Sequence, residues 1–549
     1  MLEQGHAAFA RGDEPLALDC FSRILEADPR HLNALHNRGV LLGRANRIEE
    51  ALQCFAEILA LDPGNVSALV NSGIGLAHLG CNTAALERFT TATVTDPGHM
   101  EAWMHRGQIL ARLRRPAEAA ECYASVLRLD PRHIGAQLDL AQVLQVLGRP
   151  VEALMCFGDA LNNLHRFPQA LECYDRLQAE RPRDPFVLVG RAAALAGLDR
   201  LDDALECLRQ ALRIHPDLPI AINNRSFIHL AQGRLPEGFR GQEVRWKLPP
   251  YKDRRLNTPA PPWLGGEPLS GRTILLHHEQ GMGDTLQFVR YAPLLAQRGA
   301  KVVLRAPAAL IELLRTVEGV AEVVGDDAPL PAHDVHCPIM SLPMAFGTTL
   351  QTIPAGTPYL HADPARVRLW SERLGAASRL RVGLVWAGHR VAPINYSRDI
   401  PLTALRPLLA LNAEFVSLQK DVAPEDAAEL SSLPVARLGE SVADFADTAA
   451  LIANMDLVIA AETSTVHLAG ALGKPVWVMN CYAPCWRWLR GRTDSPWYPT
   501  ARLFKQTSFD DWASVVDQVR SALSELLDGA ASDHASPSPR AASRSTMAA

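Results

Sequence analysis

The sequence predicts an α-helical solenoid followed by an α/β region with two lobes of parallel sheet. In the first half, small, aromatic and proline residues recur every 34 residues, a period that is typical of stacked helix pairs. In the second half, short apolar runs alternate with helical patterns, as they do where parallel strands are joined by crossover helices.

The composition is that of an ordinary soluble protein. The chain has 549 residues, of which 48% are hydrophobic and 21% charged, and its formal net charge is -5. No basic stripe with interleaved aromatics occurs, so a nucleic-acid partner is not expected. Neither a leader pattern nor a run of about 18 apolar residues is found. These features predict a cytoplasmic protein without a transmembrane segment.

Four kinds of position carry the 34-residue period. They are Gly39, Ala51, Phe55 and Pro63, then Gly73, Ala85, Phe89 and Pro97, then Gly107, Ala119, Tyr123 and Pro131. Small residues let two antiparallel helices approach, the aromatic ring fills the space between them, and the Asp-Pro pair ends the second helix. The pattern resembles the tetratricopeptide repeat, and about seven repeats are predicted in residues 1–248.

Six cysteines follow the repeat and are predicted to be reduced residues packed between helices. They are Cys20, Cys54, Cys122, Cys156, Cys173 and Cys207. Two irregularities interrupt the array. The step from Ala153 to Ala170 is half a repeat, so one helix is expected to be missing. Residues 151–164 are then expected to serve both neighbouring helices. A kink or a repacked face is expected there. Met1 falls inside the first helix, which leaves open a short helix or an upstream start.

A solenoid of this kind offers a concave groove for extended peptides or partner proteins. The alternative is a structural spacer or a dimerisation arm. The array ends before a proline-rich linker, 249–271.

Seven apolar runs beyond the linker predict strands in two Rossmann-like lobes, 272–360 and 361–528. The runs are 274–277, 301–305, 334–338, 381–386, 414–418, 456–460 and 475–479. A stretch around 355–380 is expected to connect the lobes. A closing helix is predicted over 511–527, and residues 529–549, mostly Ala, Ser and Pro, are predicted to be a disordered tail.

Three motifs of the second half carry a resemblance to a known family. They are Glu279-Gln-Gly-Met-Gly-Asp-Thr-Leu-Gln-Phe, Arg381-Val-Gly-Leu-Val-Trp-Ala-Gly and Glu462-Thr-Ser-Thr-Val-His-Leu-Ala-Gly-Ala-Leu-Gly-Lys-Pro-Val-Trp. From about 260 to 527 the chain resembles bacterial proteins that join tetratricopeptide repeats to a heptosyltransferase-like glycosyltransferase. The resemblance implies the GT-B fold and an inverting, metal-independent transfer from a nucleotide-diphosphate sugar. O-GlcNAc transferases show a similar pairing of repeats with a GT-B region.

The first motif is predicted to carry the base. Gly281 and Gly283 let the backbone approach a substrate closely, and Asp284 matches the carboxylate that looks like the base in heptosyltransferases. An inverting transfer needs such a base on one side and positive charge on the other. The alternative is that Asp284 is a helix N-cap.

The third motif is predicted to hold the diphosphate at the start of a helix, where exposed N–H groups favour anions. Thr463, Ser464 and Thr465 would add hydroxyl donors. Glu462 takes the place of an aspartate that contacts the donor sugar in the related family. His467 is either a ligand or a packed helix residue.

Further contacts to the nucleotide sugar are expected from Arg398, with Arg390 as its substitute, and from Gln419 and Lys420 at a strand end. Arg398 resembles a basic residue that contacts the diphosphate, and a guanidinium suits bidentate phosphate binding. A solvated lysine is the alternative for Lys420.

No metal or other cofactor is expected. The chain has no Asp-x-Asp motif, and His277, His278 and Glu279 lie on a strand whose neighbouring side chains point to opposite faces. A zinc site at Cys481 and Cys485 is a remote alternative because no second pair lies nearby. The segment Trp486–Pro499, rich in aromatic and arginine residues, either stacks on a ligand or buttresses the fold.

The sequence therefore predicts a glycosyltransferase that moves a sugar from a nucleotide diphosphate to a protein or glycan acceptor recruited by the repeats. The alternative is a non-catalytic scaffold or sugar-nucleotide sensor with a degenerate transferase region.

Overall fold

The computed structural model divides the chain into two compact units, Met1–Ala194 and Leu195–Ala549. It describes residues 1–249, 251–252, 254–388 and 398–535. The repeat pattern of the sequence continues into the second unit.

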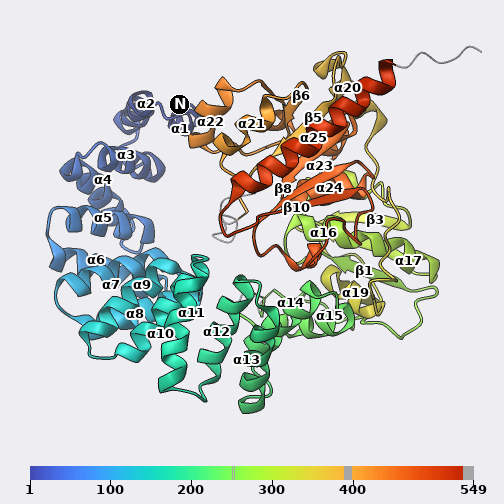
Figure 1. Cartoon of the computed structure of the whole chain (residues 1–549). Helices are drawn as coiled ribbons and strands as arrows, with labels where there is room; N and C mark the ends of the chain where they lie inside the picture. The colour runs from blue at the N-terminus through green and yellow to red at the C-terminus, as the bar shows by residue number, and fades with distance from the viewer. Residues whose placement is uncertain (250, 253, 389–397, 536–549) are drawn as a thin grey trace, which may run out of the picture. The chain divides into compact units, whose positions relative to one another are not determined.

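The first unit consists of consecutive helices paired with their sequence neighbours, as Figure 1 shows. They are α1 (Leu2–Ala10), α2 (Glu14–Ala27), α3 (Leu32–Arg44), α4 (Ile48–Leu61), α5 (Val66–His78), α6 (Asn82–Thr95), α7 (Met100–Arg112), α8 (Pro116–Leu129), α9 (Ile134–Val146), α10 (Pro150–Asn163), α11 (Phe167–Glu180) and most of α12 (Pro185–Gly197). Helix α1 has 9 residues, against 13 in α3 and α5.

The loops between repeats are built from paired caps. An aspartate ends the second helix of each of four repeats and accepts the N–H of the residue two further on at 2.9–3.2 Å; these are Asp28, Asp62, Asp96 and Asp130. Three residues later, an imidazole or amide caps the next helix by accepting an N–H at 3.1–3.3 Å; these are His31, Asn65, His99 and His133. Both helix ends of each loop thus have partners, which fixes the angle between repeats.

The repeated glycine is required by the aromatic ring of the following helix. A Cβ on Gly39 would lie 2.8 Å from Cε1 of Phe55, and one on Gly73 would lie 2.7 Å from Cε1 of Phe89. Phe55 and Phe89 are 3% and 0% exposed. The two helices can therefore approach only because a hydrogen replaces the methyl group.

We expect Gly39→Ala to lower the free energy of unfolding by about 1–3 kcal/mol, because the methyl group overpacks Phe55. Gly43 of the same helix is the matched control, since a Cβ on Gly43 would have no described atom within 4 Å. Gly43→Ala should raise stability by about 0.5–1 kcal/mol through helix propensity. Calorimetry of the full chain measures both, and equal stability of the two variants would show that the glycine contact is not tight.

The half-repeat step is accommodated by one shared helix, as predicted. Ala153 of α10 is buried like the alanine of other second helices, while a Cβ on Gly158 would lie 2.9 Å from Cζ of Tyr174 in α11, the contact that a first helix makes. Helix α10 therefore acts as the second helix for α9 and as the first for α11. It remains one continuous helix of 14 residues, so the face is repacked without a break.

The last helices of the array belong to the second unit: α13 (Leu201–Ile214), α14 (Pro219–Ala231), α15 (Leu235–Gln242) and the 3-10 helix η1 (Glu243–Lys247). Helix α14 contacts the segment Trp486–Trp488, and α15 contacts α19 (Leu342–Ala345). The end of the repeats is thus part of the α/β body.

The first lobe holds a parallel sheet of order β3-β2-β1-β4. Its strands are β1 (Thr273–His277), β2 (Lys301–Ala306), β3 (Val320–Gly325) and β4 (Val335–Pro338). Its helices are α16 (Met282–Phe288), η2 (Val289–Tyr291), α17 (Ala292–Gln297), η3 (Ala308–Leu310), α18 (Ile311–Leu314), η4 (Ile339–Ser341) and α19. Three strands were predicted; β3 was not.

The second lobe holds a parallel sheet of order β10-β9-β8-β5-β6-β7. Its strands are β5 (Arg381–Val385), β6 (Glu414–Ser417), β7 (Val435–Arg437), β8 (Leu457–Ala461), β9 (Val476–Asn480) and β10 (Ala501–Lys505). All residues of β5, β8 and β9 are buried, as expected for central strands covered by helices on both faces. Strands β7 and β10 were not predicted.

The helices of the second lobe are α20 (Pro364–Leu374), η6 (Leu402–Leu405), α21 (Arg406–Leu409), α22 (Pro424–Ser432), η7 (Gly439–Ser441), α23 (Phe445–Ala453), α24 (Ser464–Ala471), η8 (Trp486–Trp488) and α25 (Trp512–Ala535). Helix α20 lies in the stretch expected to connect the lobes. Helix α25 corrects the predicted end of the closing helix, because it continues eight residues past Leu527 into the segment predicted to be disordered. Alanine is a good helix former, and three alanines lie in this extension, Ala530, Ala531 and Ala535.

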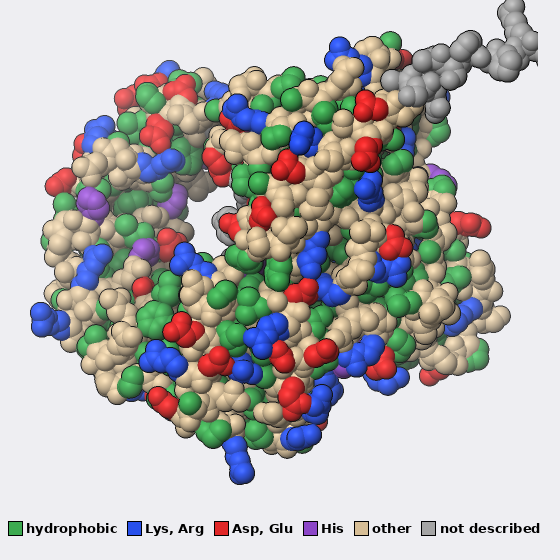
Figure 2. Space-filling model, in the orientation of Figure 1, with side chains coloured by type: hydrophobic (Ala, Val, Ile, Leu, Met, Phe, Trp, Pro, Cys, Tyr) green, Lys and Arg blue, Asp and Glu red, His purple; other side chains and the backbone are tan. Residues whose placement is uncertain are grey.

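Basic and acidic side chains are interspersed over the face drawn in Figure 2. Among the helices of the described residues, none combines the length and apolar character that a membrane crossing requires.

Candidate functional site

The glycine turn after β1 starts helix α16, and Asp284 caps it. Gly281 is the N-cap residue, and its N–H donates to Oδ2 of Asp284 at 2.9 Å. Asp284 thus occupies the third position of the helix and reaches back to the cap, which is the carboxylate half of a capping box. The alternative role of Asp284 as the N-cap residue is wrong in position, because Gly281 is the N-cap and Asp284 accepts its N–H from the third helical position.

The second oxygen of Asp284 faces the other lobe. Oδ1 accepts a hydrogen bond from the guanidinium of Arg487, which follows β9, and the two side chains are 16% and 11% exposed. Arg487 also donates to Oε1 of Gln287 at 2.6 Å. Burial disfavours its charged form, but Asp284 and, after it, Cys485 and Glu462 together outweigh burial and raise the pKa of Arg487. The guanidinium therefore stays charged between the lobes.

Sequence reasoning missed Arg487 as an individual residue. Its segment was identified as rich in arginine and aromatic residues, and Trp486, Trp488 and Trp497 are indeed buried. The aromatic rings thus have the buttressing role that was one of two alternatives. One feature of the sequence could have pointed to Arg487. It is a charged residue between two tryptophans, in a stretch that has no helical or strand pattern.

The third motif forms the start of helix α24, and this start meets that of α16. A Cβ on Gly283 would lie 2.9 Å from Cδ2 of His467 and 3.4 Å from Cα of Ser464. Gly283 is therefore needed for the close approach of two helices from different lobes. Thr463 is the N-cap residue, and its side chain makes no cap hydrogen bond. Thr465 is buried.

His467 is a packed residue in this structure. It is 6% exposed, its Nδ1 lies 2.9 Å from the hydroxyl of Tyr498, and its ring stacks on Trp488 at 5.6 Å between centroids. Burial and the nearby guanidinium of Arg487 hold the pKa of the imidazole well below its usual range, so the ring is neutral. Of its two predicted roles, packing is the one that these contacts describe.

Glu462 and Arg398 lie beside this junction and face each other. Nη1 of Arg398 is 3.6 Å from Oε1 of Glu462, and the N–H of Cys485 donates to Oε2 of Glu462 at 3.3 Å. The carboxylate raises the pKa of Arg398. Arg390 lies outside the described residues.

Gln419 and Lys420 follow β6 and bind to backbone groups. The N–H of Ala387 donates to Oε1 of Gln419 at 3.2 Å, which ties the loop after β5 to the loop after β6. Lys420 is exposed, and its Nζ donates to the carbonyl of Ala443 at 3.0 Å. Gln419 is buried beside the second sheet, and Lys420 lies at its surface.

Several buried polar atoms of these elements have no hydrogen-bond partner among the described residues. They are Thr285 Oγ1, Gln287 Nε2, Thr463 Oγ1 and Asn480 Oδ1. A buried polar group of this kind is costly unless water or a ligand supplies a partner. These atoms lie on α16, at the N-cap of α24 and at the end of β9, where a bound molecule would supply the missing partners.

The three residues His277, His278 and Glu279 diverge, as predicted. His277 contacts His336 at 3.2 Å, His278 pairs with Asp326 at 2.6 Å and Glu279 pairs with Arg245 at 2.8 Å. Burial lowers the pKa of His277 to about 3. No group of three or more metal-ligating side chains is found within the described residues. Cys481 and Cys485 are free thiols, and burial raises the pKa of Cys481 to about 12.

Comparison with known proteins identifies the first part of the chain. A tetratricopeptide-repeat family model matches residues 2–66, 76–134, 111–161 and 157–219. The N-terminal region is a tetratricopeptide-repeat array. The match confirms the resemblance noted from the glycine, aromatic and proline positions, and it ends before the two parallel sheets.

The protein FlbA of Caulobacter vibrioides is 27% identical over 374 residues, and the similarity covers 61% of this chain and 61% of FlbA. The chain thus spans about three fifths of the length of that relative. The covered share is larger than residues 2–219, so the similarity to FlbA extends beyond the matched repeats.

Two solved structures are similar over part of the chain. A crystal structure of MamA is 20% identical, covers 29% of this chain and 87% of its own, and has a TM-score of 0.28. A tetratricopeptide repeat protein from Parabacteroides merdae is 19% identical, with coverage of 44% and 90% and a TM-score of 0.26.

Proposed function

We propose that the protein is an inverting, metal-independent glycosyltransferase that moves a sugar from a nucleotide-diphosphate donor to a protein or glycan acceptor recruited by the repeats. The observation that carries the proposal is the meeting of Asp284 and Arg487 from different lobes where α16 and α24 begin. The two lobes in a GT-B arrangement are part of the same proposal.

The chemistry needs one group from each side. The acceptor hydroxyl attacks the anomeric carbon and gives its proton to Asp284, while the bond from that carbon to the diphosphate oxygen breaks. The leaving diphosphate takes up the bonding electrons and needs positive charge nearby. Arg487 and Arg398 would supply two guanidinium groups there, and the N–H groups at the start of α24 would add donors.

In this structure the guanidinium of Arg487 pairs with the carboxylate of Asp284. A donor diphosphate would compete for Arg487 and release Asp284. Thr463, the N-cap residue of α24, lies in the same lobe as Arg487, and its buried hydroxyl, which has no partner among the described residues, would donate to the diphosphate.

The second candidate function is a sugar-nucleotide sensor or scaffold whose transferase region is degenerate. One observation favours it. Both oxygens of Asp284 are occupied, one by the N–H of Gly281 and the other by Arg487. A sensor would bind nucleotide without transfer, and a scaffold would bind none.

Nucleotide binding by the full chain is the direct test. We expect a nucleoside diphosphate or its sugar conjugate to raise the melting temperature, since a ligand at 100 times its Kd stabilises the folded state by about 2.7 kcal/mol. Adenosine, guanosine, cytidine, thymidine and uridine diphosphates and their sugars form the panel. Arg487→Gln should weaken binding at least about tenfold, as expected for loss of a charge-assisted phosphate contact.

Arg366→Gln is the matched control, because Arg366 pairs with Asp444 and Asp447 at 2.8 and 2.9 Å between α20 and α23 of the same lobe. It should bind nucleotide like the wild type. Absence of stabilisation by every nucleotide at millimolar concentration would rule out both transferase and sensor.

A further inference from the structure

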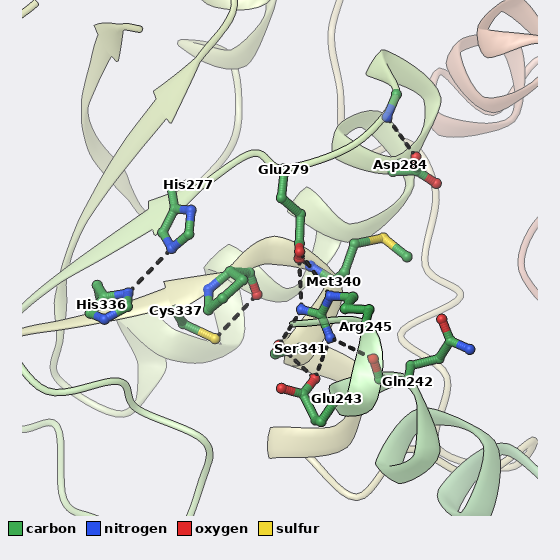
Figure 3. A network of polar contacts seen from close by, with 12 residues as sticks. Gln242, Glu243, Arg245, His277, Glu279, Asp284, His336, Cys337, Met340 and Ser341 are labelled. Atoms are coloured by element: carbon green, nitrogen blue, oxygen red, sulfur yellow. Dashed lines mark hydrogen bonds and ion pairs between the residues drawn. The ribbon is translucent and has the colours of Figure 1, made fainter. Parts of the chain in front are cut away.

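The end of the repeat array reaches into the first motif through one buried arginine. Arg245 lies in η1 and is 1% exposed. Its Nε and Nη2 donate to Oε2 and Oε1 of Glu279 at 2.8 and 2.9 Å, a bidentate pair. Figure 3 shows the guanidinium between Glu279 and Glu243, with Asp284 further along the same chain segment as Glu279.

All five donor hydrogens of Arg245 are used. Besides the two bonds to Glu279, Nη2 donates to Oγ of Ser341 at 2.8 Å, and Nη1 donates to the carbonyl of Gln242 at 3.1 Å and to Oε1 of Glu243 at 2.7 Å. A planar guanidinium has five donors in a fixed fork. Because each of the five hydrogens has an acceptor, the guanidinium is held in one orientation, and this fixes the position of the Glu279 carboxylate.

Glu279 is also held by the segment after β4. Its Oε1 accepts the N–H of Met340 at 3.2 Å, and Ser341 Oγ donates to Glu243 Oε1 at 2.8 Å. Met340 and Ser341 belong to η4, which follows β4. The side chain of Glu279 thus joins three elements: the end of the repeats, the loop after β4 and the turn after β1.

Glu279 is two residues before Gly281 and five before Asp284. Strand β1 ends at His277. Glu279 therefore lies in the short segment between this strand and the Gly281–Asp284 turn, and its side chain anchors that segment. The far end of the turn is held by Asp284, through Gly281 and Arg487. The turn is therefore fixed at both ends, at one end by a residue of the array.

An apolar contact of the array supports the same region. Phe239 of α15 packs edge-on against Phe288 at 6.3 Å and against Trp486 at 5.5 Å between ring centroids. Phe288 ends α16, and Trp486 precedes Arg487. The last repeat thus contacts both sides of the Asp284–Arg487 pair.

We propose that Arg245 is a positioning residue, through which the last repeat sets the place of the Gly281–Asp284 turn and so of the base. The proposal rests on the proposed function. The array then has two parts with different tasks: its last repeat shapes the site, and the repeats before it are left to bind the acceptor. Arg245 touches neither substrate nor base and acts only through Glu279.

The test compares Arg245→Lys with Arg381→Lys. The lysine keeps the charge and loses the bidentate fork. Arg381 is the matched control because it is also buried, also pairs with a glutamate, Glu414, at 3.1 Å, and lies at the start of β5, the end of the strand away from the site. Glu279→Gln is the second variant, since it keeps the shape of the side chain and removes its charge.

Hydrogen exchange of the full chain is the first readout. In Arg245→Lys we expect the amides of residues 279–285 and of Met340 to exchange at least about tenfold faster, because local opening becomes easier, while the amides of α24 keep the wild-type rate. Arg381→Lys should leave residues 279–285 unchanged. Wild-type exchange at the turn in both Arg245→Lys and Glu279→Gln would overturn the proposal.

Transfer kinetics is the second readout. A displaced base lowers kcat, so we expect Arg245→Lys to lose roughly ten- to a hundredfold in kcat, with the KM for the donor within about twofold of wild type. A fall in melting temperature without a change in kcat would leave Arg245 as a structural residue and overturn the proposal. If the wild type itself shows no transfer, the proposed function fails, and the exchange rates alone decide whether the repeat holds the turn.

Discussion

Asp284→Asn is expected to lower sugar transfer by about a hundred- to ten-thousandfold, the usual contribution of a general base. The amide oxygen can still accept the N–H of Gly281, so the cap of α16 is kept. The positive charge of Arg487 is no longer neutralised by Asp284, so nucleotide diphosphate should bind as tightly as in the wild type or more tightly. Transfer rate and nucleotide affinity, measured on the same preparation, separate the two effects.

Asp363→Asn provides the control for the cap. Asp363 is the N-cap residue of α20 and accepts the N–H groups of Ala365 and Arg366 at 2.7 and 2.9 Å, so it is, like Asp284, a carboxylate that binds backbone N–H groups at a helix start, but it has no place at the junction. It should leave transfer unchanged. If Asp284→Asn also transferred sugar at the wild-type rate, Asp284 would be a helix cap and nothing more.

Removing residues 1–247 is expected to prevent folding of the α/β region, whereas removing residues 1–194 should leave a soluble, folded protein. The longer deletion takes away Arg245, and loss of one partner of a buried ion pair costs about 3–5 kcal/mol. It also removes Phe239, whose burial contributes about 1.5–3 kcal/mol. Asp199, the partner of Arg490 and of Lys505 at 2.8 Å, is lost as well.

Together these losses approach the whole stability of an ordinary domain, about 5–15 kcal/mol. Soluble yield and calorimetric melting temperature of the two fragments measure the difference. Equal melting temperatures for 195–549 and 248–549 would mean that the last helices of the array are dispensable for the fold. The same comparison shows where an acceptor-binding test should cut the chain, since only the shorter deletion leaves the candidate site whole.

The repeat array was predictable because each repeated position has its own steric demand. Gly39, Ala51 and Phe55 are constrained by one another across a single helix pair. The same residue types therefore recur from repeat to repeat, and their period is visible in the sequence. The shared helix α10 was predictable for the same reason, since its spacing shows one helix too few. Family comparison confirms the repeats.

The strands that sequence reasoning missed are all at sheet edges. β3 and β10 end one side of each sheet and β7 ends the other side of the second. An edge strand has one neighbour and is partly exposed, so charged residues such as Glu322, Arg437 and Arg502 interrupt its apolar run. The central strands, which are mostly buried, gave continuous apolar runs and were found, as was the edge strand β4.

The residues of the candidate site could be named from motifs, but their partners could not. Arg487 is 203 residues from Asp284, and Arg245 is 34 residues from Glu279. No periodicity links such pairs, because the contact is made by the packing of elements and not by local geometry. The sequence therefore suggested roles for Asp284 and Gly283, whereas their ion pair and helix contact became visible only in three dimensions.

Helix α10 also limits how this protein can change in length. An array whose helices alternate strictly can gain or lose a helix pair at any loop and keep its pairing. Here one helix presents an alanine face to α9 and a glycine face to α11, so a duplication that separated those faces would leave one of them without its neighbour. The array can therefore gain or lose whole helix pairs before α10. At α10 itself such a change would remove its pairing with α9 or with α11, so the repeats on both sides keep their order relative to this helix.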